Sequence, residues 1–352
     1  MAVWATNVGA GNSRKNRITA APVVAGGRVF AMDAGAVVSA VSTGGALLWQ
    51  ADLTAGFDKG GGVSGGGLAA QGNRAPATTG YGEVVAMDAA SGQMLWRQRV
   101  DAPAQGAPAV DGGVVYVTGR DGSAWAIDAD NGKVIWQVFG ALQGRAGWAA
   151  PRRPWATARC ISAMPGLDGR LKVGDGTAVW HASAAGSGWP GRCQPHITGD
   201  AALVGGTLYT GTGGRTVALE AGLARWSGAS PGAMGPSGDR GRGLSGQRRG
   251  ALMRLTPQRR NGLVGRDALF RGAEGEEAQG GDGALRPALG RRAVGSPDRR
   301  QAVGLSPTDG SLVYQTAIPG GAAGPARGGG GVLPCRDRQG AGLWLSAEGL
   351  PV

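Results

Sequence analysis

Residues 126–136 read AIDADNGKVIW, and residues 86–96 read AMDAASGQMLW, so the chain contains nearly the same eleven-residue phrase twice. Each copy ends in Trp, with a Gly four positions earlier and an Asp eight positions earlier. The aromatic residue that ends the phrase marks further copies, in which the Gly recurs more often than the Asp. The marker residues are Trp4, Trp49, Trp96, Trp136, Trp180, Trp226 and Tyr314, the glycines are Gly45, Gly92, Gly132, Gly176, Gly222 and Gly310, and the aspartates are Asp88 and Asp128.

The markers are regularly spaced. Successive steps are 45, 47, 40, 44 and 46 residues, followed by one step of 88 residues between Trp226 and Tyr314. One marker is therefore missing near residue 270, where ALMRL (251–255) is followed by no phrase. Counting that gap gives eight positions at a mean step of about 44 residues, the length of a four-stranded propeller blade.

The cleanest unit, residues 107–136, reads as an antiparallel meander. Its turns are DGG (111–113), RDGS (120–123) and DNG (130–132), and short apolar runs such as VVYV lie between them. Asn-Gly and Asp-Gly supply the positive φ that tight hairpins need. A meander cannot bury both of its faces alone, so we expect an all-β protein in which neighbouring sheets pack radially, with each Trp between adjacent blades.

The pattern A-x-D-x-x-x-G-x-x-x-W after GG-x-V-[YF] resembles the repeat of pyrroloquinoline-quinone-like β-propellers. Within that group the chain is similar to the lipoprotein B subunit of the outer-membrane barrel-assembly machinery. The resemblance covers residues 1–143 well, 172–226 in part and 305–320 as an island. It implies an eight-bladed propeller of four-stranded antiparallel blades, closed by pairing strands from the two ends of the chain, which leaves no long exposed edge.

Length and the ends of the chain add further expectations. At 352 residues, blades of this size account for one propeller domain over residues 1–352. No apolar run is long enough for a transmembrane helix, and no signal peptide opens the sequence. Met1 lies inside a repeat, so we expect a missing upstream segment or a mis-assigned start; the family's members carry an acylated Cys there.

The net charge of +12 is confined to the disturbed part of the chain. Residues 1–140 carry 10 Lys and Arg and 10 Asp and Glu, whereas the rest carry 26 and 14. The excess of positive charge falls in stretches that lack the repeat and are rich in Arg, Gly, Pro and Ala. The repeat nevertheless returns at its expected position in LSPTDGSLVYQTAIPGG (305–321). Either compensated frameshifts or a basic insertion of matching length explains this. The degraded stretches are residues 144–171, 227–304 and 334–352, against well-formed repeats over residues 1–143.

The search for catalytic or metal-binding residues predicts none. The Asp of the phrase heads a hairpin in each copy, where a carboxylate accepts turn N–H bonds. The remaining His and Cys residues have no metal-site or disulfide spacing and are expected to be incidental. They are His181, His196, Cys160, Cys193 and Cys335.

Three local features have structural interpretations. The glycine cluster DKGGGVSGGG (58–67) lacks the order of a phosphate loop and is expected to be a loop entering a blade. GNSRKNR (11–17) is expected to be a solvated loop, with an acidic partner surface as the alternative. Pro76 and Pro334 stand where other units have an aromatic or apolar strand residue, which costs burial and a ladder hydrogen bond.

By the resemblance, the chain is a non-catalytic scaffold without a cofactor, at the periplasmic face of the outer membrane. It would bind barrel-assembly subunits and unfolded barrel precursors through loops and blade edges. The alternative from the same repeat is a quinone-dependent dehydrogenase, which holds its calcium ion with Glu, Asn and Asp; Glu83 is the single Glu in residues 1–143. A propeller protein that functions in adhesion or is associated with the cell wall is a third hypothesis. Nucleic acid is not an expected partner, because no basic motif with interleaved aromatic residues occurs.

The frameshift interpretation makes a prediction about the gene. Translating the coding DNA of codons 140–340 in all three frames is expected to yield GG-x-V-Y strands and a Trp near residues 266–270. If no frame restores the repeat, the basic segment is genuine, and an acidic or nucleic-acid partner returns to consideration.

Overall fold

The computed structural model describes backbone and side chains for residues 5–11, 20–54 and 66–139, apart from residues 105, 120 and 122. Elsewhere it describes chiefly the backbone of the strands. Every regular element in this part of the chain is a β-strand. Among the described residues, no helix has the length and apolar character that crossing a membrane requires.

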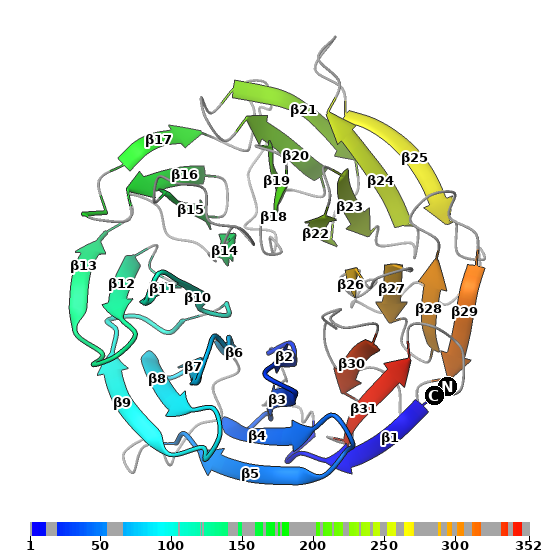
Figure 1. Ribbon diagram of the computed structural model, residues 1–352. Helices are drawn as coiled ribbons and strands as arrows, with labels where there is room; N and C mark the ends of the chain where they lie inside the picture. The colour runs from blue at the N-terminus through cyan, green and yellow to red at the C-terminus, as the bar shows by residue number, and fades with distance from the viewer. Residues whose placement is uncertain are drawn as a thin grey trace.

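The first three sheets are four-stranded antiparallel meanders in which the strands pair in sequence order. Figure 1 shows the sheets arranged around a ring, with the first strand of each towards the middle and the fourth on the outside. They comprise β2 (Val23–Ala25), β3 (Arg28–Met32), β4 (Val37–Ser42) and β5 (Leu47–Asp52); β6 (Gly66–Leu68), β7 (Arg74–Thr79), β8 (Glu83–Asp88) and β9 (Met94–Arg99); and β10 (Ala109–Asp111), β11 (Val114–Thr118), β12 (Ala124–Asp128) and β13 (Val134–Val138).

Further strands continue the same order around the ring. The last sheet joins two ends of the chain, because β1 (Ala2–Asn7) pairs with β31 (Ala341–Ser346), which pairs with β30 (Val332–Arg336). The others are β14 (Gly147–Ala149), β15 (Arg159–Met164), β16 (Leu167–Lys172) and β17 (Ala178–Ala182); β18 (Ala202–Val204), β19 (Thr207–Thr212), β20 (Arg215–Glu220) and β21 (Arg225–Pro231); β22 (Met234–Asp239), β23 (Arg242–Gly246), β24 (Leu252–Pro257) and β25 (Val264–Phe270); and β26 (Ala288–Leu289), β27 (Val294–Pro297), β28 (Gln301–Leu305) and β29 (Leu312–Ala317).

Strands also occupy stretches whose sequence lacks strand alternation. β15 lies within residues 144–171, and β22 to β27 lie within residues 227–304. A ladder of backbone hydrogen bonds does not depend on which side chains the strands carry. The strands can therefore follow the spacing of the repeat where the apolar pattern is lost.

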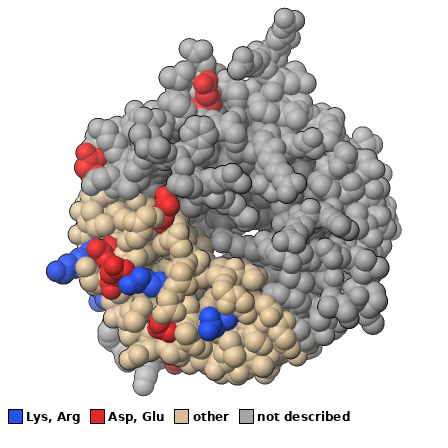
Figure 2. Space-filling view, viewed as in Figure 1, with Lys and Arg blue, Asp and Glu red and all other residues tan. Residues whose placement is uncertain are grey.

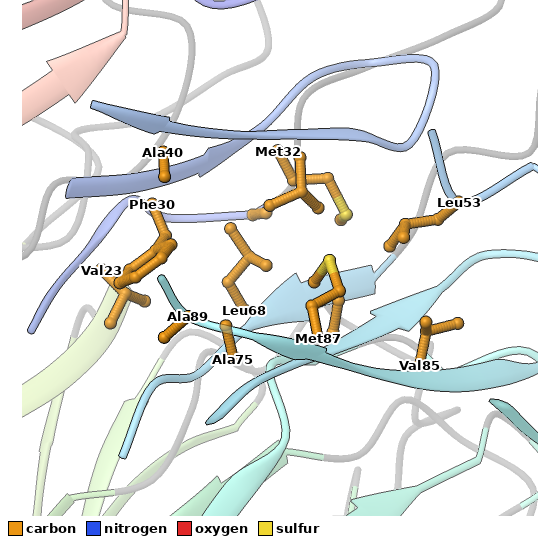
Figure 3. Close-up of a cluster of buried hydrophobic side chains, with 13 residues drawn as sticks. Val23, Phe30, Met32, Ala40, Leu53, Leu68, Ala75, Val85, Met87 and Ala89 are labelled. Carbon is orange, nitrogen blue, oxygen red and sulfur yellow. The ribbon is translucent and has the colours of Figure 1, made fainter. Parts of the chain in front are cut away.

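In the three sheets whose side chains are described, the core lies between neighbouring sheets, and each of these sheets contributes both of its faces. Along β8, Val85 and Met87 face the β2–β5 sheet, where they pack with Phe30 and Met32 (Figure 3). The alternate residues of β8 pack with the β10–β13 sheet, including Ile127. Since successive side chains of a strand point to opposite faces, one strand serves two cores. Burying each large apolar side chain contributes about 1.5–3 kcal/mol.

An irregularity of strand pairing recurs beside the marker aromatic residues. Trp96 pairs with Ala86 while Met94 pairs with Met87, so Leu95 has no partner in the ladder. This is a β-bulge, which adds one residue to the outer strand. The same pairing shift stands directly before Trp4, Trp49, Trp136, Trp180 and Tyr314.

Two sheets depart from the marker pattern read in the sequence. Trp226 pairs with Leu219 on the turn side of the bulge, and Gly228 takes the ladder position that an aromatic residue has elsewhere. Near the missing marker, Phe270 pairs with Leu252 directly after a bulge. The outer strand of that sheet, β25, begins at Val264. Phe270 is therefore its last residue, whereas Trp96 is the third residue of β9. The ladder position near residue 270 is thus aromatic even though the phrase is absent.

Each described marker Trp docks on the hairpin turn of the following sheet. Trp49 Nε1 donates to the carbonyl oxygen of Ala89 at 3.2 Å, and Trp96 Nε1 donates to that of Ala129 at 2.9 Å. The indole ring lies over the glycine of that turn: a Cβ on Gly92 would lie 2.5 Å from Trp49 Cε3. Gly92 has a φ of +75°, a conformation that other residues rarely adopt, so both the backbone and the space favour glycine.

The markers also contact an aromatic residue of their own sheet. The ring centroids of Phe30 and Trp49 are 5.9 Å apart, and those of Tyr116 and Trp136 are 6.1 Å apart. Pro76 takes the corresponding place in β7, since it pairs with Ala86 as Phe30 pairs with Ala40. Pro76 is buried, and its carbonyl oxygen accepts the N–H of Ala69 at 2.9 Å.

The glycine cluster of residues 58–67 ends inside a strand. Gly66 and Gly67 open β6, although the sequence predicts a loop through residue 67. A Cβ on Gly66 would lie 2.1 Å from the carbonyl oxygen of Thr78, and one on Gly67 would lie 2.4 Å from Ala107 Cα. These glycines therefore allow close approach of backbones at the inner strand.

A largely buried ion pair within the β6–β9 sheet is tied to the neighbouring β2–β5 sheet. Glu83 is 3% exposed, and its Oε2 accepts a hydrogen bond from Arg97 Nη1. Arg97 Nη2 donates to the carbonyl oxygen of Leu53, at the end of the neighbouring β5, at 3.1 Å. The guanidinium thus joins a buried carboxylate of one sheet to the backbone of the next.

The docking of Trp49 predicts the effect of a single methyl group. Gly92→Ala is expected to lower the free energy of unfolding by about 2–4 kcal/mol, because it adds a clash with the indole to the strain at positive φ. Gly72→Ala is the control: its φ is +58°, and nothing lies within 4 Å of the added Cβ. Equal losses in urea unfolding of the two variants would contradict the docking role of Gly92.

The ion pair gives a second prediction. Arg97→Met is expected to lower the free energy of unfolding by about 3 kcal/mol, since it leaves the Glu83 carboxylate buried without its partner. The double variant Glu83→Gln with Arg97→Met should recover most of the loss. Arg74→Met, at an exposed ion pair, is the control and should cost below about 1 kcal/mol. A double variant as unstable as Arg97→Met alone would refute the role of the unpaired charge.

Candidate functional site

The turns that receive the tryptophans are held by their own aspartates. Asp88 Oδ1 accepts the N–H groups of Ala90 at 2.9 Å and of Ser91 at 2.8 Å, and the Ser91 hydroxyl at 2.9 Å. The N–H of Gly92 donates to the Asp88 carbonyl oxygen at 2.9 Å, which closes the turn. The carboxylate is thus occupied by the loop that presents the glycine to Trp49.

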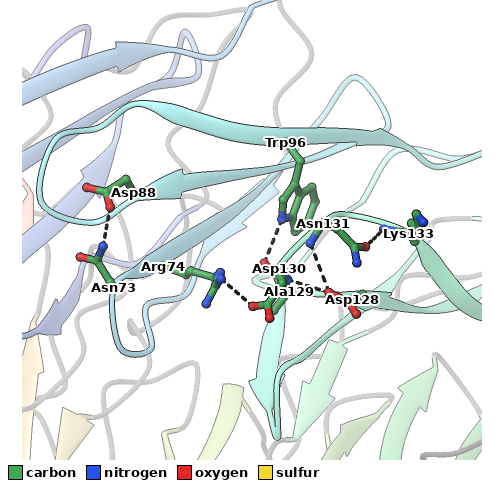
Figure 4. Close-up of polar contacts among 9 residues, drawn as sticks. All are labelled: Asn73, Arg74, Asp88, Trp96, Asp128, Ala129, Asp130, Asn131 and Lys133. Atoms are coloured by element: carbon green, nitrogen blue, oxygen red, sulfur yellow. Dashed lines mark hydrogen bonds and ion pairs between the residues drawn. The ribbon is translucent and has the colours of Figure 1, made fainter.

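The turn of the next sheet is built in the same way. Asp128 Oδ1 accepts the N–H of Asp130 at 2.8 Å and that of Asn131 at 3.2 Å (Figure 4). The N–H of Gly132 donates to the Asp128 carbonyl oxygen at 2.9 Å. Both aspartates of the repeated phrase therefore hold turn backbone, which is the kind of contact that the sequence indicates for them.

The hydrogen bonds of Asp88 also set its protonation. The backbone N–H of Ser91, followed by its hydroxyl, lowers the pKa of Asp88 below the ordinary value, and a smaller effect of desolvation opposes them. The amide of Asn73 donates to the other carboxylate oxygen. Asp88 is therefore an ionised acceptor and is not suited to donate a proton near neutral pH.

The turn of the first sheet uses a different residue. Ser42 Oγ accepts the N–H of Ala46 at 3.0 Å, and the N–H of Gly45 donates to the Ser42 carbonyl oxygen at 3.0 Å. This hairpin is one residue shorter, since Trp49 pairs with Ala40, nine positions back, whereas Trp96 pairs with a residue ten positions back. The shorter loop explains why this copy keeps the Gly of the phrase without the Asp.

Charged side chains near these turns pair with each other at the surface. Arg74 Nη2 lies 2.6 Å from Asp130 Oδ1 and joins two neighbouring sheets; the two side chains are 38% and 69% exposed. Figure 2 shows basic and acidic side chains interspersed over a largely uncharged face in the described part of the chain. Among these residues, no group of three or more His, Cys, Asp and Glu side chains lies in a metal-binding arrangement.

The outer strands of the first three sheets expose paired apolar side chains beside the bulge. In each sheet the two residues before the marker Trp are 40–47% exposed, although the strand then continues into polar residues. Each outer strand also has one edge without a neighbour among the described strands. We call these six residues the rim pairs: Leu47 and Leu48, Met94 and Leu95, and Val134 and Ile135.

The repeated phrase locates each Trp but does not by itself predict the exposure of the two apolar residues before it. In a strand with one exposed face, alternation would place a polar residue directly before the Trp and an apolar residue two positions before it. LLW, MLW and VIW each have three apolar residues in a row. Three consecutive apolar residues on an outer strand indicate a bulge or an exposed apolar side chain. That signal was available in the repeat itself.

Several residues considered in the sequence lie outside the described residues. His196 and Cys193 belong to this group, as do Gly222 and Gly310 and the greater part of GNSRKNR (11–17). For others only the strand backbone is described, and nothing follows for their side chains. These are Trp4, Trp180, Trp226, Tyr314, His181, Cys160, Cys335 and Pro334.

Comparison with protein families gives a match over residues 33–171, to the model described as outer membrane protein assembly factor BamB. The matched segment covers the second to fourth markers and both copies of the opening phrase. No curated protein matches the sequence significantly.

Solved structures resemble the chain over nearly its whole length. BamB from Moraxella catarrhalis is 17% identical with a TM-score of 0.72, and the match covers 96% of this chain and 99% of that one. A computationally designed protein, Ika8, is 12% identical with a TM-score of 0.72, covering 97% and 98%. Quinohemoprotein alcohol dehydrogenase from Comamonas testosteroni is 12% identical with a TM-score of 0.66, covering 100% of this chain and 77% of that one.

At these identities the structural likeness establishes the fold, an all-β arrangement of antiparallel four-stranded sheets like that of a β-propeller. The family match adds the repeat on which that fold is built. Over residues 33–171 the chain thus resembles outer membrane protein assembly factor BamB in sequence, and over nearly its whole length it resembles BamB from Moraxella catarrhalis in fold.

Proposed function

We propose that this protein is a non-catalytic scaffold of the outer-membrane barrel-assembly machinery, at the periplasmic face of that membrane. The observation that carries the proposal is the family match over residues 33–171 together with the end-to-end structural likeness to BamB. Its partners would be other subunits of the machinery and unfolded barrel precursors.

The proposal includes the architecture of the whole chain, residues 1–352, as one eight-bladed ring. Eight sheets among the described strands and the marker spacing of about 44 residues support this count. The residues that would mark the blades are the marker aromatic residues and their glycines together with Asp88 and Asp128, and the β22–β25 sheet would be the blade without a marker phrase. Residues 1–143 would form the well-formed part, and residues 144–171, 227–304 and 334–352 the altered part.

The rim pairs support a role in protein binding. An apolar side chain that is nearly half exposed gains free energy when a partner covers it, at about 25 cal/mol for each Å² buried. The outer strands also offer unpaired backbone groups, to which an extended segment of a partner can add. The turns offer less, since Asp88 and Asp128 are already occupied by their own loops.

The second candidate function is a quinone-dependent dehydrogenase, favoured by the structural likeness to a quinohemoprotein alcohol dehydrogenase. Quinone-dependent dehydrogenases that share this repeat hold a calcium ion with Glu, Asn and Asp side chains. Glu83, the Glu of the well-formed repeats, is buried and committed to Arg97. This engagement favours the scaffold over the enzyme.

The test is co-purification of the tagged protein with barrel-assembly subunits from solubilised outer membranes. We expect recovery of the subunits with the native chain, and at least a tenfold loss for the triple variant Leu48→Ser, Leu95→Ser and Ile135→Ser. The control is Ala46→Ser, Gln93→Ser and Lys133→Ser, at exposed positions close to the same rim pairs. This control should retain binding.

Two results would overturn the proposal. One is the absence of the assembly subunits from complexes of the folded native chain. The other is saturable binding of pyrroloquinoline quinone with calcium in an absorbance titration, which would favour the dehydrogenase. Loss of binding in the control variant as well would remove the rim pairs from the proposal and leave the scaffold role in place.

A further inference from the structure

The segment Ala2–Ala10 contacts two sheets that are far apart in the sequence. Its first part, β1, pairs along its length with β31, from Ala2 opposite Leu345 to Asn7 opposite Ala341. Its second part lies against the β2–β5 sheet, where Val8 is 1% exposed and packs with Ala31 and Val41. We call residues 2–10 the strap.

Asp33 holds the end of the strap. This buried carboxylate, 7% exposed, lies in the turn between β3 and β4. Its Oδ1 accepts the N–H groups of Gly35 and Val37, both at 2.8 Å, and its Oδ2 accepts the N–H of Ala10 at 2.8 Å. One oxygen therefore fixes the turn of its own sheet, and the other fixes the strap.

The geometry around Gly9 leaves little freedom at this contact. Gly9 has a φ of +118°, and a Cβ there would lie 2.4 Å from Asp33 Oδ2. The N–H of Ala34 donates back to the carbonyl oxygen of Ala10 at 3.4 Å. The glycine thus lets the strap turn closely over the carboxylate.

Two further side chains hold the strap between Asp33 and β31. Ser39, which is fully buried, donates its hydroxyl to the Val8 carbonyl oxygen at 3.2 Å and accepts from Gln50 Nε2 at 3.0 Å. Thr6 Oγ1 donates to the carbonyl oxygen of Gly45 at 2.6 Å, in the glycine turn of the first sheet.

We infer that Asp33 is a latch: it holds the strap on the β2–β5 sheet and thereby couples the closure of the ring at β1–β31 to that sheet. Other neighbouring sheets in the described part are joined by a tryptophan on a glycine turn, within one continuous run of chain. At the strap a carboxylate joins the two parts, because one of its oxygens accepts N–H groups of the β3–β4 turn and the other accepts the N–H of Ala10. Release of the latch opens the ring at this seam, which is a conformational device separate from the scaffold role.

The test is hydrogen–deuterium exchange of the full chain with Asp33→Asn, an isosteric change that leaves one acceptor oxygen, so that the side chain can no longer hold the turn and the strap together. We expect exchange in β1 and β31 to rise about tenfold, the effect of losing a hydrogen bond to a charged acceptor, although β31 is far from residue 33 in sequence. Exchange in β8 and β12 should stay unchanged.

Asp121→Asn is the matched control. Asp121 also lies between the second and third strands of its sheet, but its Oδ1 accepts the N–H of Ser123 at 2.9 Å and its hydroxyl at 2.6 Å, within its own turn. The control should change exchange only around that turn. If Asp33→Asn likewise affects only residues 33–37 and the strap end while β1 and β31 keep native protection, the latch is refuted.

Ser39→Ala provides a second variant in case Asp33→Asn does not fold. It removes the bond to the Val8 carbonyl and should raise exchange of the same two strands by a smaller factor, about three- to tenfold. Unchanged exchange of β1 and β31 in Ser39→Ala would likewise refute the coupling.

Discussion

The docking of a tryptophan onto the glycine turn of the next sheet is the contact on which the well-formed part of this fold depends. It combines a hydrogen bond from the indole nitrogen, such as that from Trp96 to Ala129, with a ring placed where a side chain on Gly132 would clash. The contact needs the indole and a glycine at positive φ at fixed spacing, and in the turns of Gly92 and Gly132 an Asp also holds the backbone. Repeats of about 44 residues supply the aromatic residue and the Gly in successive units, so the spacing of the sequence becomes the spacing of the sheets.

This dependence explains which parts of the structure follow from sequence. Gly92 and Trp96 could be located as a recurring pair, and the strands around them follow from turn residues and alternation. The pairing of Trp49 with Gly92 could not, because the spacing shows that both recur but not that the partner belongs to the next unit. The bulge beside each marker and the exposure of Leu48 and Leu95 also depend on strand register, which a one-residue difference in the turn can shift.

In residues 144–171 and 227–304, strand pairing occurs without the apolar sequence pattern that usually accompanies it. Strands such as β22 and β23 pair within a stretch whose composition has little apolar alternation, so their ladder follows spacing and backbone geometry. Burial between sheets needs side chains, and Gly228 stands where the neighbouring units place an aromatic ring. The pairing of strands can therefore be continuous around the ring even where the apolar pattern of the sequence is lost.

The closure of the ring, where β1 pairs with β31, differs from the junctions between the other described sheets. Sheets joined by Trp docking each contact only their neighbours, so their stability is close to a sum of local terms. Closure is different, because β31, which also pairs with β30, gains its second partner only when β1 is in place, and β1 continues into the part of the strap that Asp33 and Ser39 of the β2–β5 sheet hold. The strap thus lets the well-formed sheets support the opposite end of the chain. Loss of that support would be felt first in the pairing of β31 with β1.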